Sequence, residues 1–316
     1  MTQTFPKRVR IVEVGPRDGL QNESAEVATD DKARFVELLA AAGVPTIEVA
    51  AFVDPRRVPR MADAADVFGR IRRQPGARYS ALVPNLKGLQ RAVDAGADEV
   101  AVFAAASETF SRRNINQGIS KSLQAYREVC RTAALAGLKV RGYLSTSFGC
   151  PYEGPVPPQR VVDLVQRMLE IGVYEVAVSD TIGVGHPGHV SSLLDQLVQK
   201  VGAASLALHF HDTRGMALAN VLSALPFAIS CFDSSAGGLG GCPFAPGASG
   251  NLATEDLVYM LDGLGIETGV ALPALLGASK FIATRLDHGL PSRVFQAAVR
   301  SRSRSEAAPE GTDADL

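Results

Sequence analysis

Residues 139–180, KVRGYLSTSFGCPYEGPVPPQRVVDLVQRMLEIGVYEVAVSD, carry the pattern that decides the fold. The segments 139–146 and 174–180 are rich in strand-forming residues, and the segment 158–172 between them repeats apolar residues with the period of a helix. A strand, a helix and a second strand in this order form a βαβ unit, in which the two strands lie parallel. We therefore expect a parallel sheet covered by helices.

The same unit recurs along the chain. Further strand candidates are found at residues 9–14, 46–52, 78–83, 99–105, 205–211 and 231–236, which makes eight in all. Helical stretches separate them, such as residues 30–43, whose apolar side chains follow a 3.6-residue period up to Gly43. Eight such units over roughly 250 residues are typical of an α/β protein with a closed (β/α)8 TIM barrel.

The chain continues past the eighth predicted strand. Residues 268–300 are predicted to form extra C-terminal helices outside or over the barrel, so we expect residues 1–300 to be one domain including this extension. Residues 301–316 are small, polar and proline-containing, which is typical of a disordered tail. The amino terminus enters the first predicted strand at once, and we expect no signal peptide or transit helix.

The composition limits the class of protein. Of the 316 residues, 46% are hydrophobic and 21% charged, as in an ordinary soluble globular protein. Lys and Arg total 32 and Asp and Glu 33, so the net charge of -1 favours neither nucleic acid nor anionic lipid as a partner. No apolar run is long enough to span a membrane. Four scattered cysteines without a CxxC pair favour reduced thiols and a cytoplasmic location.

The HFHDT motif is the strongest candidate for chemistry. His209 and His211 are two residues apart in a predicted strand, so they project from one face and can share a metal. An arbitrary HxH pair is more often structural, but the carboxyl end of a barrel strand is where active sites form. Asp18, in GPRDGLQNE after the first strand, is a second candidate ligand, although an ordinary Asp-Gly turn explains it equally well. Imidazoles with oxygen ligands favour Mg²⁺ or Mn²⁺ over structural zinc.

A glycine-rich segment spans residues 236–256 and surrounds Cys242. Its glycines indicate a backbone that bends sharply or approaches a ligand closely, and its spacing matches neither a P-loop nor a dinucleotide fingerprint. Cys242 is a nucleophile, a proton donor or an inert thiol. Asn251 is expected to begin the following helix, either as a simple cap or as a further metal ligand.

Further polar residues fall at or just past the predicted strand ends. Glu48 and Asp180 are unusual as core residues without partners, and we expect them to orient cations, histidines or Arg17. The residues expected to bind substrate or support the site are Gln21, Glu48, Tyr143, Asp180 and Thr181.

With these motifs in hand, the chain resembles the 3-hydroxy-3-methylglutaryl-CoA lyases, within the wider group of metal-dependent barrel lyases and Claisen-type synthases. The likeness runs from about residue 9 to 300 and includes GPRDGLQNE, HFHDTRGMALANV and GGLGGCPFAPGASGNLATEDL. The resemblance implies the metal ligands Asp18, His209, His211 and Asn251, a catalytic Arg17, a loop cysteine at Cys242, and supporting acids at Glu48 and Asp180.

The resemblance also implies a reaction. A divalent cation would hold the 3-hydroxyacyl-CoA, His209 or Asp18 would take the hydroxyl proton, Arg17 would stabilise the enolate of acetyl-CoA, and Cys242 would protonate it. A homodimer is expected.

Departures from the family pattern keep other substrates open. Arg214 stands where a tyrosine is usual, and Ala50 and Ala51 replace hydroxyl residues. A lyase for citramalyl-CoA or a longer branched 3-hydroxyglutaryl-CoA is therefore an alternative. A non-catalytic metal-binding scaffold is an alternative of another class.

Overall fold

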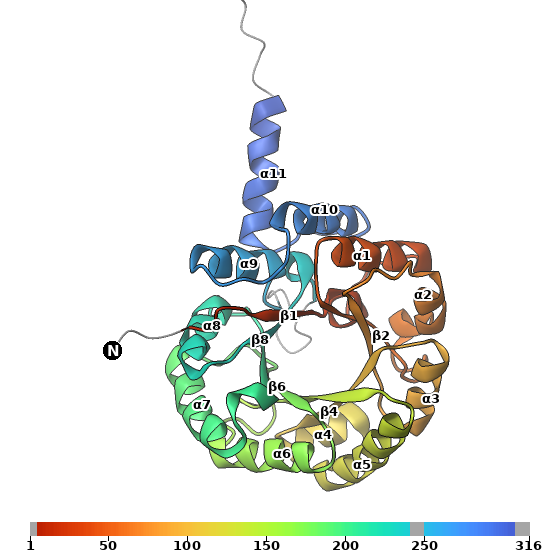
Figure 1. Cartoon of the computed structure of the whole chain (residues 1–316), viewed down its shortest axis with the longest axis vertical. Coiled ribbons are helices and arrows are strands. Elements are labelled where there is room, and N and C mark those ends of the chain that lie inside the picture. The colour runs from red at the N-terminus through yellow and green to blue at the C-terminus, as the bar shows by residue number, and fades with distance from the viewer. Residues whose placement is uncertain (1–4, 241–249, 307–316) are drawn as a thin grey trace, which may run out of the picture.

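The computed structural model describes residues 5–240 and 250–306, and in it eight parallel strands close into a barrel (Figure 1). Each strand pairs with the next one in sequence, and the last pairs with the first. The strands are β1 (Arg10–Glu13), β2 (Thr46–Ala51), β3 (Arg78–Leu82), β4 (Glu99–Ala105), β5 (Lys139–Ser145), β6 (Glu175–Asp180), β7 (Leu206–Phe210) and β8 (Cys231–Ser234). The predicted α/β class, the TIM barrel and all eight predicted strands are confirmed.

Helices form a ring around the outside of the barrel (Figure 1). The helices of the described residues, including those of the C-terminal extension outside this ring, are α1 (Thr29–Ala41), α2 (Ala64–Arg70), α3 (Leu86–Asp94), α4 (Glu108–Ile115), α5 (Ile119–Leu135), α6 (Pro158–Glu170), α7 (Pro187–Val201), α8 (Ala217–Ala224), α9 (Thr254–Gly263), α10 (Leu272–Ala283) and α11 (Arg293–Glu306). Short helical turns are η1 (Gly15–Gly19), η2 (Pro59–Met61), η3 (Ala203–Ser205), η4 (Leu225–Phe227) and η5 (Ala236–Gly238). No helix in residues 5–240 or 250–306 has the length and apolarity that crossing a membrane needs.

The C-terminal extension lies on one side of the barrel (Figure 1). Helix α10 packs against α1, and α11 packs against α9 and α10 before it projects away from the ring. The predicted extra helices are therefore confirmed. The predicted boundary at residue 300 falls inside a helix, because α11 runs on to Glu306. Residues 307–316 lie outside the described part of the chain, and their disorder stays a prediction.

A glycine fixes the contact between α1 and this extension. Gly43 has a φ of +89°, a conformation that favours glycine, and a Cβ there would lie 2.3 Å from the carbonyl oxygen of Gly269. The neighbouring carbonyl of Ala42 accepts a hydrogen bond of 2.8 Å from the amide of Ala271. The turn that the sequence predicts at Gly43 therefore also brings the end of α1 into contact with the segment before α10.

The inside of the barrel is unusually polar. Arg141 and Tyr143 are two apart on β5 and share its inward face, where TIM barrels commonly carry branched apolar side chains. Glu175 on β6 and Asp233 on β8 meet Arg141 inside the barrel, and all three are buried. Buried charges need partners, and these strands supply them to one another. These polar side chains continue along the inside of the barrel toward the carboxyl ends of the strands.

Candidate functional site

Arg17 and Asp18 lie on η1, the turn of π-helix that follows β1. The turn begins as soon as the strand ends, because the amide of Asp18 donates to the carbonyl of Val14 over 2.7 Å. A Cβ on Gly19 would lie 2.8 Å from Cβ of Leu239, so the turn packs closely on the segment after β8. Because β1 pairs with β8, this turn lies beside the ends of β7 and β8.

Asp18, His209 and His211 come together at the mouth of the barrel. One ligand atom from each lies within 4.8 Å of the others, as expected of groups that share a metal ion. Burial would raise the pKa of Asp18, but Arg17 and the two histidines lower it to about 2, which keeps the carboxylate ionised. Burial and the neighbouring His209 lower the pKa of His211 to about 3, which favours the neutral imidazole that binds metals.

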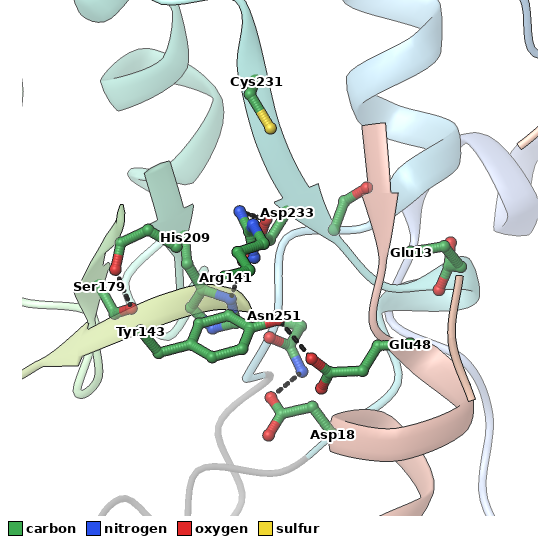
Figure 2. Close-up of polar contacts among 12 residues, drawn as sticks. Glu13, Asp18, Glu48, Arg141, Tyr143, Ser179, His209, Cys231, Asp233 and Asn251 are labelled. Carbon is green, nitrogen blue, oxygen red and sulfur yellow. Dashed lines mark hydrogen bonds and ion pairs between the residues drawn. The ribbon is translucent and has the colours of Figure 1, made fainter. Parts of the chain in front are cut away.

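Asn251 completes this cluster from the other side. Its Nδ2 donates to Oδ2 of Asp18 at 3.0 Å and to the carbonyl of Leu239 at 3.1 Å (Figure 2). A backbone bridge pairs it with His211. Asn251 does not begin the next helix, as the sequence had suggested, because α9 starts at Thr254 with Ala253 as its N-cap.

Two buried atoms of this cluster lack a hydrogen-bond partner among the described residues. They are Oδ1 of Asn251 and Nδ1 of His211. A buried polar atom without a partner costs free energy, and a bound cation relieves that cost at an oxygen or imidazole nitrogen. The four residues predicted as ligands therefore fit a divalent cation.

Arg17 is held by carboxylates on two sides. Its Nε donates to Glu48 and its Nη1 to Asp18, and the guanidinium carbon lies 5.5 Å from the ring centre of Tyr143. The hydroxyl of Tyr143 donates to the second oxygen of Glu48 at 2.7 Å (Figure 2). Glu48 and Tyr143 lie within their strands rather than beyond them. The pKa of Arg17 is raised, because the effect of the two carboxylates exceeds that of burial, and Arg17 stays charged.

Asp180 and Thr181 organise the loop after β6. The carboxylate of Asp180 accepts the amides of Val184 at 3.0 Å and Gly185 at 2.8 Å, while burial raises its pKa. Oγ1 of Thr181 accepts the amide of Thr146 at 2.7 Å. Asp180 thus fixes the backbone of this loop. Among the described residues, its carboxylate makes no hydrogen bond to His209 or His211.

A cavity of about 820 Å³ opens above the cluster. Seven of the predicted site residues line it: Arg17, Asp18, Gln21, Tyr143, Thr181, His209 and His211. Sequence analysis missed other lining residues, among them Ser145, Ser179, Arg57 and Arg113. Ser145 and Ser179 had a detectable signal, because each lies at the carboxyl end of a predicted strand.

Asp233 was also missed by the sequence analysis. It lies in the middle of β8, and its partners Arg141 and His209 come from other strands, which no local pattern indicates. Both of its carboxylate oxygens accept from Arg141, and Oδ2 lies 3.3 Å from Nδ1 of His209. Burial would raise its pKa, but Arg141 and His209 lower it.

The departures from the family pattern lie away from the cavity wall. Arg214 is exposed, and its guanidinium donates to the carbonyls of Ile182 and Gly183 at 2.8 and 2.9 Å. Ala50 and Ala51 are buried in β2, and neither lines the cavity. Cys242 lies outside the described residues, so its predicted role stays a prediction.

Comparisons with known proteins agree on one family. The model of the family described as HMGL-like matches residues 8–282. The chain is 52% identical to the mitochondrial hydroxymethylglutaryl-CoA lyase of Bos taurus over 297 residues, 94% of this chain and 91% of that protein.

Solved structures give the same result. The hydroxymethylglutaryl-CoA lyase of Pseudomonas aeruginosa superposes with a TM-score of 0.92 at 49% identity, over 94% of this chain and 99% of that one. An HMG-CoA lyase of Acinetobacter baumannii, solved with coenzyme A and 3-methylmalate, superposes with a TM-score of 0.88 at 37% identity, over 100% of this chain and 99% of that one.

Proposed function

The chain belongs to the HMGL-like family, and from this membership we propose that it is a divalent-metal-dependent lyase that cleaves 3-hydroxy-3-methylglutaryl-CoA to acetyl-CoA and acetoacetate. The observation that carries the proposal is Arg17 beside the cluster of Asp18, His209 and His211 at the barrel mouth. A fixed guanidinium next to a cation site suits a reaction in which an oxygen of the substrate gains negative charge. Reactions of this type serve leucine degradation and ketone-body formation.

Asp18, His209, His211 and Asn251 would hold the cation. A carboxylate, an amide oxygen and two imidazoles form a mixed set of hard and borderline ligands, which favours Mg²⁺ or Mn²⁺. When bound, the cation supplies Lewis-acid polarisation of the substrate oxygens. The unpartnered Oδ1 of Asn251 supports this assignment.

The residues of the chain would then move protons and stabilise charge. His209 or Asp18 takes the proton from the C3 hydroxyl, and the electron pair of that O–H bond forms the ketone of acetoacetate as the C2–C3 bond breaks. The pair from the broken bond becomes the enolate of acetyl-CoA, whose oxygen accepts hydrogen bonds from Arg17. Cys242 donates its thiol proton to C2 and completes acetyl-CoA.

Release of acetyl-CoA tests the activity directly. We expect acetyl-CoA from 3-hydroxy-3-methylglutaryl-CoA in a coupled assay, loss of activity after exhaustive chelation, and recovery on adding Mg²⁺ or Mn²⁺. Activity that survives chelation would contradict the metal proposal. No acetyl-CoA from any of several 3-hydroxyacyl-CoA thioesters would favour the non-catalytic scaffold.

Replacement of the loop cysteine tests the last step. We expect Cys242→Ala to bind substrate with little change but to lower kcat by about 10²-fold or more, because the enolate loses its proton donor. The matched control is Cys150→Ala, at a buried cysteine whose Sγ lies 3.0 Å from Oγ of Ser107 and which does not line the cavity. Normal turnover by Cys242→Ala would remove this residue from the chemistry.

The acyl group is best tested with related thioesters. Citramalyl-CoA and longer branched 3-hydroxyglutaryl-CoA were alternatives because of Arg214, Ala50 and Ala51. None of the three lines the cavity, which weakens that argument. A higher kcat/KM for either thioester than for 3-hydroxy-3-methylglutaryl-CoA would revive it.

We also propose that the chain forms a cytoplasmic homodimer, and that the barrel and its C-terminal extension, which runs to the end of α11 at Glu306, form one domain. Sedimentation of the purified chain measures the oligomeric state. Cell fractionation measures the location.

A further inference from the structure

Asp233 lies beside His209 in the barrel. The two residues are register partners on the neighbouring strands β8 and β7. Asp233 is 1% exposed, and its Oδ2 lies 3.3 Å from Nδ1 of His209. The carboxylate therefore faces the side of the imidazole that carries Nδ1.

Arg141 supplies the charge that holds this carboxylate. Nη2 of Arg141 donates to Oδ1 of Asp233 at 2.7 Å, and Nη1 donates to Oδ2 at 3.2 Å (Figure 2). Arg141 is itself 1% exposed and is fixed through Nε by Glu175 at 2.8 Å. A two-pronged contact with an arginine stabilises an ionised carboxylate, which can only accept hydrogen bonds. In the contact between Nδ1 of His209 and Oδ2 of Asp233, the proton must therefore be on Nδ1.

We propose that Asp233 is the positioning residue for His209: it keeps the ring proton on Nδ1 and so directs Nε2 toward the ligand cluster with Asp18 and His211. Metal-bound histidines commonly donate their other N–H to a carboxylate, and loss of such a partner weakens metal binding by about 10- to 100-fold. The inference rests on the metal centre of the proposed function. It also bears on the proton transfer, because a His209 engaged at both nitrogens has no lone pair left, which favours Asp18 as the base.

The first experiment needs neither metal nor substrate. Long-range ¹⁵N–¹H correlation spectra of histidine-labelled protein report the tautomer of each ring, and His209→Asn identifies the signals of His209. We expect the Nδ1–H form in the wild type and a larger share of the Nε2–H form in Asp233→Asn, whose amide can donate to Nδ1. A wild-type His209 that is protonated on Nε2 instead overturns the proposal.

The second experiment measures Mn²⁺ binding by the free protein with electron paramagnetic resonance. We expect Asp233→Asn to bind Mn²⁺ about 10- to 100-fold more weakly than the wild type. The matched control is Glu175→Gln, which removes a carboxylate from the same arginine but makes no contact with His209. This control should stay within about threefold of the wild type.

The outcomes separate this inference from the proposed function. Equal losses in both variants, or none in Asp233→Asn, contradict the positioning role of Asp233. A wild type that binds no Mn²⁺ contradicts the metal centre, while the tautomer still tests the contact between Asp233 and His209. If Asp233→Asn fails to fold by circular dichroism, the wild-type tautomer decides alone.

Discussion

At the residue scale, two neighbouring carboxylates hold Arg17 in one orientation. Its Nε and Nη1 donate to different carboxylates, on Glu48 and Asp18, and Tyr143 holds the outer oxygen of Glu48. A planar guanidinium can make both contacts and still present further N–H groups, whereas an ammonium group is a single point charge. Two neighbouring carboxylates thus fix the direction in which Arg17 offers its remaining donors.

Replacement of Arg17 by lysine tests this orientation. We expect Arg17→Lys to lower kcat by about 10²- to 10³-fold with a smaller change in KM, because a donor to the developing enolate is lost while positive charge stays. Steady-state kinetics measure both constants. Arg113→Lys, at another arginine that lines the cavity, is the control. Retention of full kcat in Arg17→Lys would mean that charge alone suffices.

The role of Asn251 as a metal ligand is tested by the Mn²⁺ requirement of the enzyme. In Asn251→Ala the cluster loses Oδ1 and the hydrogen bond to Asp18, so we expect the Mn²⁺ concentration for half-maximal activity to rise by about tenfold or more. Asn114→Ala removes an asparagine from the cavity wall and should leave that concentration unchanged. An unaltered Mn²⁺ requirement in Asn251→Ala rules the residue out as a ligand.

At the scale of elements, the segment between α10 and α11 is hydrogen-bonded to the segment that follows η1, and we call this contact the clasp. Nε2 of His288 lies 2.6 Å from Oε2 of Glu23, and Ser24 donates to Asp287 at 3.1 Å. Arg60, after β2, donates to the carbonyl of Glu23 at 3.2 Å. The clasp joins the C-terminal extension to the segment that follows Gln21 in the cavity wall.

This clasp predicts a dependence of stability on pH. The hydrogen bond with Glu23 raises the pKa of His288, so its contribution is complete below the unfolded pKa of about 6.5 and is lost as pH rises through the folded pKa. We expect the free energy of unfolding to fall with pH above that value in the wild type, and less steeply in His288→Gln. Urea unfolding at several pH values measures the slopes. Glu23→Gln should flatten the slope in the same way, and equal slopes in all three proteins would exclude the clasp.

The carboxyl ends of the strands explain what the sequence could predict. Strand ends meet at one face of a barrel, so the local motifs after β1 and at the end of β7 were enough to predict that Asp18, His209 and His211 lie together. The start of α9 was predicted wrongly at Asn251, because a capping residue and a ligand share the same local pattern. Whether Asn251 caps a helix or binds a metal depends on residues that are far away in the sequence.

At the scale of the whole molecule, the polar interior could not be predicted from the sequence, because it too depends on contacts between distant residues. Arg141, Glu175 and Asp233 lie on three different strands, so each is far in the sequence from the charged residues that it contacts. Their pairing depends on barrel closure and register, which no local pattern specifies. Arg57 and Arg113 escaped notice for a similar reason, since loops and helices bring them to the cavity wall from separate parts of the chain.

The barrel also divides its site unequally between two halves of the chain. Arg17 and Asp18 come from η1 and Glu48 from β2, whereas His209, His211 and Asn251 lie from β7 onward. The buried contacts among Arg141, Glu175, Asp233 and His209 all lie within the second half. A chain cut between α5 and β5 would therefore give one fragment with the carboxylate ligand and another with the imidazoles and their support. Manganese binding would then report the reassembly of the two fragments.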